Sequence, residues 1–145
     1  MKKILIYYSL SGNGDIVANY LKNKGYEIRK VTTLEPLPKN RGLQIMTGGF
    51  KALINYCDKI DEINIDDYDR LIIASPIWND RLSSPINTVI KNINKDEEID
   101  FILYSGSGKA NKACKRINKI FKKAKILILQ EPKKYHKELE KLDNY

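Results

Sequence analysis

The chain has 145 residues, and 42% of them are hydrophobic and 30% charged, which excludes a disordered chain and a disulfide-dependent miniprotein. The formal net charge of +8 comes from the C-terminal part, because residues 105–145 hold 12 Lys/Arg against 4 Asp/Glu. No apolar run has the length of a membrane span, and the apolar start stops at Ser9 without a signal-peptide cleavage site. We therefore expect a cytoplasmic protein, folded as a single domain over residues 1–145. Cys57 and Cys114 have neither CxxC nor zinc-site spacing and are expected to be buried thiols.

Short apolar segments alternate with segments of helical periodicity along the whole chain. The expected strands are 3–8, 26–31, 70–75, 99–104 and 125–130, of which 26–31 alternates as an edge strand does. The expected helices are one from Ile16 to a cap at Gly25, one around Leu43–Cys57 interrupted at Gly48-Gly49, one capped by Ser84 with Pro85 in its first turn, one over Ala110–Phe121, and one opened by Pro132. This order predicts an α/β fold in which helices cover both faces of a parallel sheet. In such sheets ligands bind where the strands end, so the loops after the first, third and fourth strands are the candidate sites.

The first of these loops has the composition of a phosphate-binding turn. It consists of Ser9, Leu10, Ser11, Gly12, Asn13 and Gly14. The free N–H groups of the following helix attract anions, and the serine and asparagine side chains add donors. The lysine of a nucleoside-triphosphate loop and the spacing GxGxxG are both missing. Taken alone, the loop fits an ordinary helix-capping turn as well as a phosphate site.

The segment Tyr8–Gly14 resembles the phosphate-binding loop of the flavodoxins, in which a hydroxyl residue, any residue, a hydroxyl residue, Gly and Asn precede Thr or Ser. The chain departs from that pattern with Gly14, and the loss of one hydroxyl bond to phosphate costs about 1.5–3 kcal/mol. Asp15 follows directly and suits a helix N-terminus. We expect its carboxylate to turn away from a bound phosphate.

The segment from Asp67 to Pro85 is similar to the flavodoxin segment in which an aromatic residue stacks on the flavin ring. Pro76 is expected to begin this loop. The resemblance implies that Trp78 contacts the ring, with Pro76, Ile77, Asn79, Asp80 and Arg81 alongside. The alternative for Trp78 is a rim residue packed on a neighbouring helix. The family often has Gly at the position of Asp80, and a non-glycine residue there disfavours a positive φ.

The loop of Ser105, Gly106, Ser107 and Gly108 resembles the third flavin loop of the family, whose backbone N–H groups bond the polar edge of the ring. The resemblance covers nearly the whole chain. It implies a flavodoxin-like three-layer sandwich with a five-stranded parallel sheet in the order 2-1-3-4-5, and flavin mononucleotide (FMN) as cofactor. Residues 41–57 contain a stretch also similar to small flavodoxin-like proteins, for which we expect a packing role.

The resemblance implies noncovalent FMN binding and electron transfer between redox partner proteins. An electron carrier is favoured over an enzyme, because the sequence shows no nucleophile or proton-transfer set, and its one histidine, His136, lacks a ligand cluster. Two alternatives stay open: a flavin-dependent NAD(P)H/quinone-type reductase with a pocket shared between subunits, and a flavin-free binding module using the basic face. Either a monomer or a homodimer is compatible with the sequence.

The basic face is expected on the helix after the third loop. Its members are Lys109, Lys112, Lys115, Arg116, Lys119, Lys122 and Lys123. A solvated surface and a docking site for an acidic redox partner both explain such a face. Nucleic acid is disfavoured as a partner, because no aromatic side chains are interleaved with the charges.

Overall fold

The computed structural model describes residues 1–35 and 38–145. The strands are β1 (Lys3–Tyr7), β2 (Tyr26–Lys30), β3 (Arg70–Trp78), β4 (Arg81–Leu82), β5 (Ile99–Ser105) and β6 (Lys125–Gln130). The helices are α1 (Asn13–Lys22), α2 (Arg41–Leu53), α3 (Ser84–Lys91), α4 (Asn111–Ile120) and the 3-10 helix η1 (His136–Leu142). Within the described ranges, no helix combines the length and apolarity that a bilayer crossing requires.

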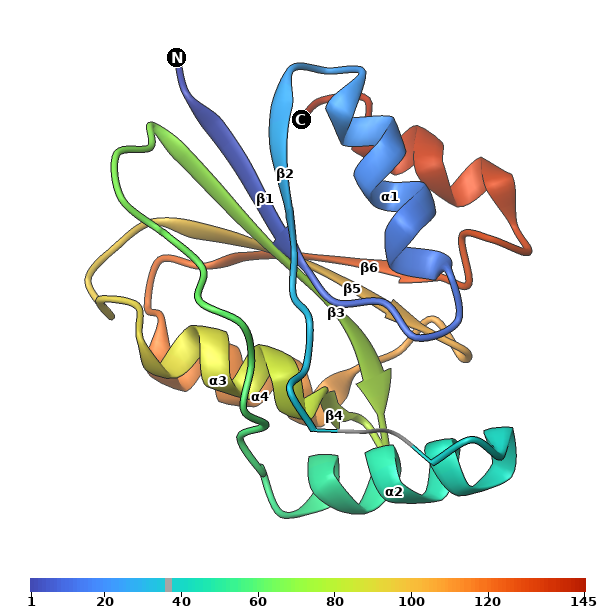
Figure 1. Cartoon of the computed structure of the whole chain (residues 1–145). Helices are drawn as coiled ribbons and strands as arrows, with labels where there is room; N and C mark the ends of the chain where they lie inside the picture. The colour runs from blue at the N-terminus through green and yellow to red at the C-terminus, as the bar shows by residue number, and fades with distance from the viewer. Residues whose placement is uncertain (36–37) are drawn as a thin grey trace.

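Five strands form a parallel sheet in the order β2-β1-β3-β5-β6, and β4 adds a two-residue antiparallel strand to the end of β3 (Figure 1). Without β4, this is the predicted order 2-1-3-4-5, with 26–31 at the edge as expected. The order reverses between β1 and β3, so the carboxyl ends of these two strands flank the place where such sheets bind ligands.

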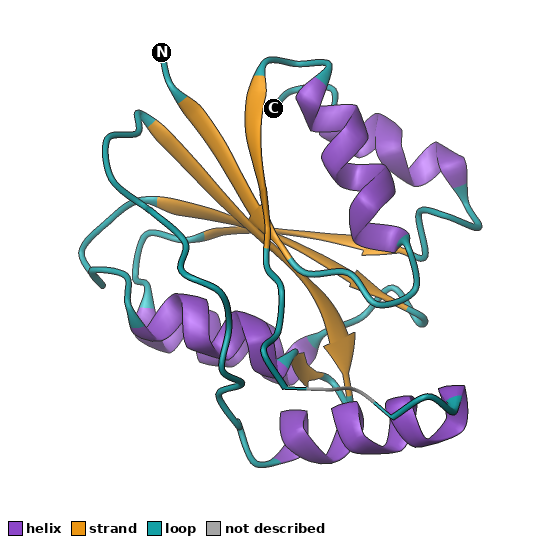
Figure 2. Ribbon diagram, viewed as in Figure 1, coloured by secondary structure: helices purple, strands orange, loops and turns teal. Residues whose placement is uncertain are grey.

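The strands β1, β3, β5 and β6 contribute alternate residues to two separate cores, as the two-residue period of a strand requires. Ile4 and Ile6 of β1 face α3 and α4, whereas Leu5 and Tyr7 face α1 and η1. Figure 2 shows these two helical layers on opposite faces of the sheet. Helix α2 belongs to neither layer, because it lies beyond the carboxyl ends of the strands (Figure 1).

Helix α2 is not interrupted at Gly48-Gly49, contrary to the prediction, and it ends before Cys57. The Asn40 side chain starts it by accepting from the N–H groups of Gly42 and Leu43, at 2.8 and 3.3 Å. The glycine pair is tolerated inside the helix because it lies against the β3–β4 turn, where larger residues do not fit.

The predicted loop at Pro76 is also wrong, because β3 continues through Pro76 to Trp78. Trp78 pairs with Arg81 across the two-residue turn of Asn79 and Asp80, whose φ values are 49° and 61°. Two consecutive positive φ values are typical of a type I′ hairpin turn, which asparagine and aspartate tolerate better than most residues. The Asn79-Asp80 pair is typical of such a turn, but the resemblance to flavodoxins predicted a loop at this place.

Three further expectations need correction. Ser83, not Ser84, occupies the N-cap of α3, and the Ser84 hydroxyl instead donates to the buried carboxylate of Asp58. The last helix is a 3-10 helix that begins at His136 rather than at Pro132. The cysteines are not buried thiols, because Cys57 is exposed and Cys114 is half-buried.

Candidate functional site

The loop after β1 wraps around a serine hydroxyl at the start of α1. Ser9 Oγ accepts from the amides of Gly12 and Gly14, at 3.2 and 3.1 Å. Gly12 is the N-cap residue with φ 98°, a conformation that favours glycine. Ser9 therefore fixes the shape of the loop, while Leu10 and Ser11 line the adjoining cavity.

Gly14 is required by packing. A Cβ at this position would overlap the Tyr104 hydroxyl and lie only 2.8 Å from Ser9 Cβ and 2.9 Å from a ring carbon of Tyr7. The Tyr104 hydroxyl donates to the carbonyl of Tyr8, and burial raises the pKa of Tyr104 well above its ordinary value, so the hydroxyl keeps its proton. The chain departs from the flavodoxin pattern here because a buried tyrosine fills the space of the missing side chain.

The Asp15 carboxylate is held by hydrogen bonds to side chains of β1 and β2. Its Oδ1 accepts from the Tyr7 hydroxyl at 2.8 Å and from Lys30 Nζ at 2.7 Å. Burial raises the pKa of Asp15, but the hydrogen bonds from Lys30 and Tyr7 lower it by more, and the net pKa lies below its ordinary value. The negative charge is thus compensated by Lys30, on the strand next to β1.

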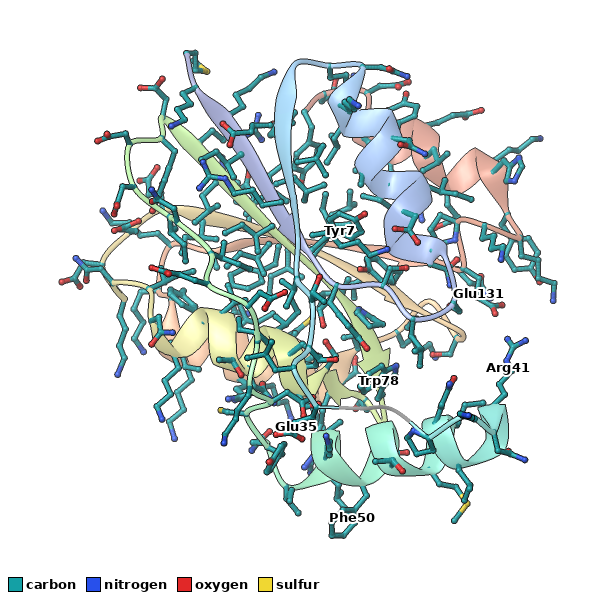
Figure 3. The ribbon with its side chains drawn as sticks, in the orientation of Figure 1. Tyr7, Glu35, Arg41, Phe50, Trp78 and Glu131 are labelled. Carbon is teal, nitrogen blue, oxygen red and sulfur yellow. The ribbon has the colours of Figure 1, made fainter. Side chains whose placement is uncertain are left out.

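Two cations near the first loop were missed by the sequence analysis. Lys133, three residues beyond β6, donates from its Nζ to the Ser11 carbonyl at 3.1 Å and from its backbone N–H to Asn13 Oδ1 at 3.0 Å. Its Nζ lies 3.3 Å from the place of a Cβ at Gly12, so the glycine admits it. Arg41, which Figure 3 shows at the start of α2, and Lys133 line one cavity together.

The positive charges of these two side chains are not neutralised by a carboxylate within the described residues. Within residues 1–35 and 38–145, neither Lys133 nor Arg41 forms an ion pair. A hollow of about 320 Å³ above the loop is lined by Arg41, Lys133 and Lys134, with Glu131 as its one carboxylate. The signal available in the sequence was the pair Lys133-Lys134, which directly follows the last strand at the ligand-binding edge.

Trp78 lines a cavity of about 450 Å³ next to the first loop. The other lining residues are Leu10, Ser11, Arg41, Gln44, Ile45, Pro76 and Lys133. The Trp78 ring meets the Tyr8 ring edge-on at a centroid distance of 5.9 Å. A Cβ at Gly48 would lie 3.0 Å from two of its ring carbons, so α2 packs directly on the indole. Trp78 is therefore packed on a helix, as the alternative interpretation expected, and it also lines the cavity, while its contact with a flavin ring stays a prediction.

The turn after Trp78 connects α2 with α4 instead of opening toward the cavity. Asn79 Nδ2 donates to the Gly49 carbonyl at 2.9 Å, and Arg81 Nη1 donates to the Leu53 carbonyl at 2.8 Å. Asp80 Oδ2 accepts from the amide of Lys112 at 3.1 Å and so caps the start of α4. Asp80 has a positive φ, which corrects the expectation that a non-glycine residue would avoid it.

The third loop forms a smaller cavity of about 290 Å³ beside that turn. It is lined by Ile77, Asp80, Ser105, Gly106, Ser107, Lys109 and Asn111. Ser105 Oγ is buried and has no hydrogen-bond partner among the described residues. Buried polar atoms nearly always have a hydrogen-bond partner, so an exception calls for an explanation. A ligand in this cavity would supply the partner that the Ser105 hydroxyl lacks. Gly108 does not line the cavity; its φ of 72° shapes the loop.

No model of a known protein family matches the chain, and no curated protein matches it. Solved structures do match. A flavoprotein from Lactobacillus acidophilus NCFM, crystallised in complex with FMN, superposes with a TM-score of 0.70 at 19% identity, over 94% of this chain and 97% of that one. The chain has the flavodoxin-like fold.

Two further structures agree with the flavodoxin-like fold. A candidate flavoprotein from Bacteroides eggerthii DSM 20697 has a TM-score of 0.66 at 18% identity, over 87% of each chain. The NMR structure of the apo-form of the flavoprotein from Lactobacillus acidophilus NCFM has a TM-score of 0.57 at 20% identity, over 90% of this chain and 91% of that one.

On this flavodoxin-like scaffold, the predicted basic face extends beyond α4 at both ends, because Lys109 precedes Asn111 and Lys122 and Lys123 follow Ile120. Arg116 is not part of its exposed surface. Arg116 is half-buried and donates to Asn87 Oδ1 on α3, and burial lowers its pKa. The exposed members are Lys109, Lys112, Lys115, Lys119, Lys122 and Lys123. His136 is exposed, and the described part of the chain holds no cluster of three or more His, Cys, Asp or Glu residues able to bind a metal.

Proposed function

We propose that the chain binds FMN noncovalently at the carboxyl ends of β1, β3 and β5 and transfers electrons between redox partners. The observation that carries the proposal is the cavity that Trp78 lines together with Leu10 and Ser11 of the first loop and with the cations Lys133 and Arg41. An aromatic plane and an anion-attracting loop with two free cations suit a flat ring that bears a phosphate. The FMN-bound flavoprotein from Lactobacillus acidophilus NCFM, which has the same fold, supports the choice of ligand.

Each part of the site has a separate task in this proposal. The phosphate would bind near Ser11 and Asn13. There the positive charge of Lys133 would compensate for the hydroxyl group that Gly14 lacks. Trp78 would cover the ring, and the unsatisfied Ser105 hydroxyl and the Gly106 backbone would bond its polar edge. Bound FMN supplies the electron chemistry, while the chain supplies binding, orientation and electrostatics.

In this proposal, a redox partner would dock on the side of the molecule that carries the exposed lysines on and beside α4. Lys109 lines the cavity formed by the third loop, and the other exposed lysines continue from it along α4. An acidic reductase or acceptor would be steered to this side of the molecule. Electron transfer should therefore slow as salt concentration rises, because screening weakens this attraction.

The direct test is a titration of purified apoprotein with FMN. Trp78 is the only tryptophan, so its fluorescence reports on this cavity alone. We expect saturable quenching at one FMN per chain and flavin absorbance that persists after gel filtration. Absence of both would overturn the proposal. Oxidation of NAD(P)H by the FMN-loaded chain without an added reductase would instead favour the reductase alternative.

A further inference from the structure

Helix α2 turns its larger apolar side chains outward. Its buried residues are Gly48 and Ala52, and Gly48 lies against the Trp78 ring at the end of β3. Its exposed hydrophobic residues are Leu43, Ile45, Met46, Phe50 and Leu53, with exposed fractions from 50% for Leu53 to 71% for Met46. Figure 3 shows Phe50 pointing away from the body of the molecule. This arrangement is the reverse of a surface helix in a monomer, in which the apolar stripe faces the core.

Four of these residues have the spacing of a helix–helix seam. Leu43, Met46, Phe50 and Leu53 follow one another at intervals of three, four and three residues. Alternating steps of three and four produce the narrow a/d stripe by which two helices pack together, knobs into holes. The stripe therefore predicts that a helix covers it, rather than a strand or a flat surface.

The same four residues are symmetric about position 48. Consider an antiparallel pair of α2 helices whose outer faces meet, with the crossing point level with residue 48 along each helix. Leu43 of one copy then lies opposite Leu53 of the other, and Met46 lies opposite Phe50. A two-fold interface has this property, since each contact occurs twice with the copies exchanged. We propose that the occupant of the α2 stripe is a second copy of this chain, bound through an antiparallel α2–α2 contact.

The charge distribution favours this partner. The outward stripe contains no charged residue, whereas the molecule as a whole carries +8. Two copies could not meet through the lysine-rich α4 face without strong repulsion, but they can meet through α2. The four side chains of the stripe are each at least half exposed, so a second copy would remove a continuous apolar area from water and contribute to the ~800 Å² that each partner gives to a stable interface.

The contact would also support the candidate FMN site, although it does not depend on FMN binding. The inner side of α2 brings Arg41, Gln44 and Ile45 to the Trp78 cavity. A second copy would cover the outer side of the same helix and hold this wall in place. Each subunit would then carry one complete cavity, with the two α4 faces free for other partners.

Sedimentation equilibrium tests the proposal on the full chain, with and without FMN, over roughly the micromolar to millimolar range in which small interfaces dissociate. We expect a monomer–dimer equilibrium in the wild type and monomers for M46K and for F50E. The control Y135E introduces the same charge as F50E at an exposed aromatic residue before η1 and should leave the dimer intact. Circular dichroism checks that all variants fold, and the FMN titration is read separately.

Mixing two variants tests the register. In the antiparallel pair, the introduced lysine of M46K faces the introduced glutamate of F50E, so an equimolar mixture should dimerise when each variant alone does not. A parallel pair would place position 46 against position 46, and mixing would restore nothing. A monomeric wild type throughout this range, binding of the stripe to lipid vesicles by a monomer, or failure of the mixture to dimerise would each overturn the proposal.

Discussion

The Tyr104 hydroxyl occupies the space into which a side chain at Gly14 would project. The two residues are 90 positions apart in sequence, on β5 and at the start of α1. This contact explains why the chain lacks the hydroxyl residue that flavodoxins carry at the end of the first loop.

Restoring that hydroxyl should therefore harm the protein. G14S would force its Cβ against Tyr104 and Ser9, and we expect a loss of about 1–3 kcal/mol in unfolding free energy, as for other overpacked sites. Urea unfolding measures the loss. The double variant G14S/Y104F removes the overlapping oxygen and should lose less than the sum of its single changes. Additive losses would show that the overlap is not the cause.

Removal of the Lys133 charge should weaken FMN binding selectively. K133M loses a charged hydrogen bond to the phosphate, worth about 1.5–3 kcal/mol, or roughly a 10–100-fold rise in the dissociation constant. Riboflavin, which has no phosphate, should bind K133M and wild type equally well in the Trp78 fluorescence titration. The matched control K137M, also exposed, should bind FMN like the wild type. An equal loss for both flavins would mean that Lys133 acts on the loop structure instead.

Substitutions of Asp80 in the β3–β4 turn should lower the unfolding free energy by different amounts, according to their backbone freedom and their ability to cap α4. D80A loses the acceptor for the Lys112 amide and leaves alanine at a positive φ, so we expect about 1–3 kcal/mol of destabilisation in urea unfolding. D80G loses the same bond but adopts this φ freely, and it should cost less. D80N keeps an acceptor oxygen and should cost least. A different ranking would contradict the assignment of both effects to Asp80.

The ion pairs that hold α2 should give the protein a specific response to acid. Lys51 on α2 pairs with Glu35 at 2.9 Å and with the buried Asp58 at 2.5 Å. Hydrogen bonds from Lys51 and Tyr56 lower the pKa of Glu35 from 4.5 to about 2. A carboxylate with a lowered pKa stabilises the fold above its unfolded-state pKa, and this contribution is lost as the pH falls through its folded-state pKa.

The comparison of E35Q with wild type measures this contribution. The difference in unfolding free energy should be constant above about pH 5 and should shrink between about pH 4.5 and pH 2. Urea unfolding at a series of pH values follows it. A difference that does not change with pH would exclude an ionised Glu35 as its source.

The parallel α/β architecture and the edge of the sheet that holds the candidate site could be predicted from local patterns, whereas the strand order was implied by the resemblance to flavodoxins. Continuous apolar segments such as 99–104 have few alternatives to a buried parallel strand, and the loops after them must meet at one edge. The resemblance to flavodoxins at Ser9–Gly14 then indicated a ligand. The binding roles of these residues stay predictions until the titration is made.

The parts that were missed depend on contacts between distant segments. Lys133 and Arg41 reach the first loop from the segment after β6 and from α2, and the pair Lys133-Lys134 after the last predicted strand was the one indication of this in the sequence. Gly48-Gly49 normally weakens a helix, so an interruption was the natural expectation. The close approach of Trp78 and Asn79, which lie 30 residues further along, reverses that expectation.

The hydrogen bond from Lys133 to Ser11 joins segments 122 residues apart. During synthesis the first loop leaves the ribosome long before Lys133 has been translated, so the nascent chain cannot yet present this cation to a phosphate. A phosphorylated ligand would thus gain its full affinity only after translation has passed β6. Chains that stop before Lys133 would lack this cation, so the ligand would stabilise them less than chains that contain it.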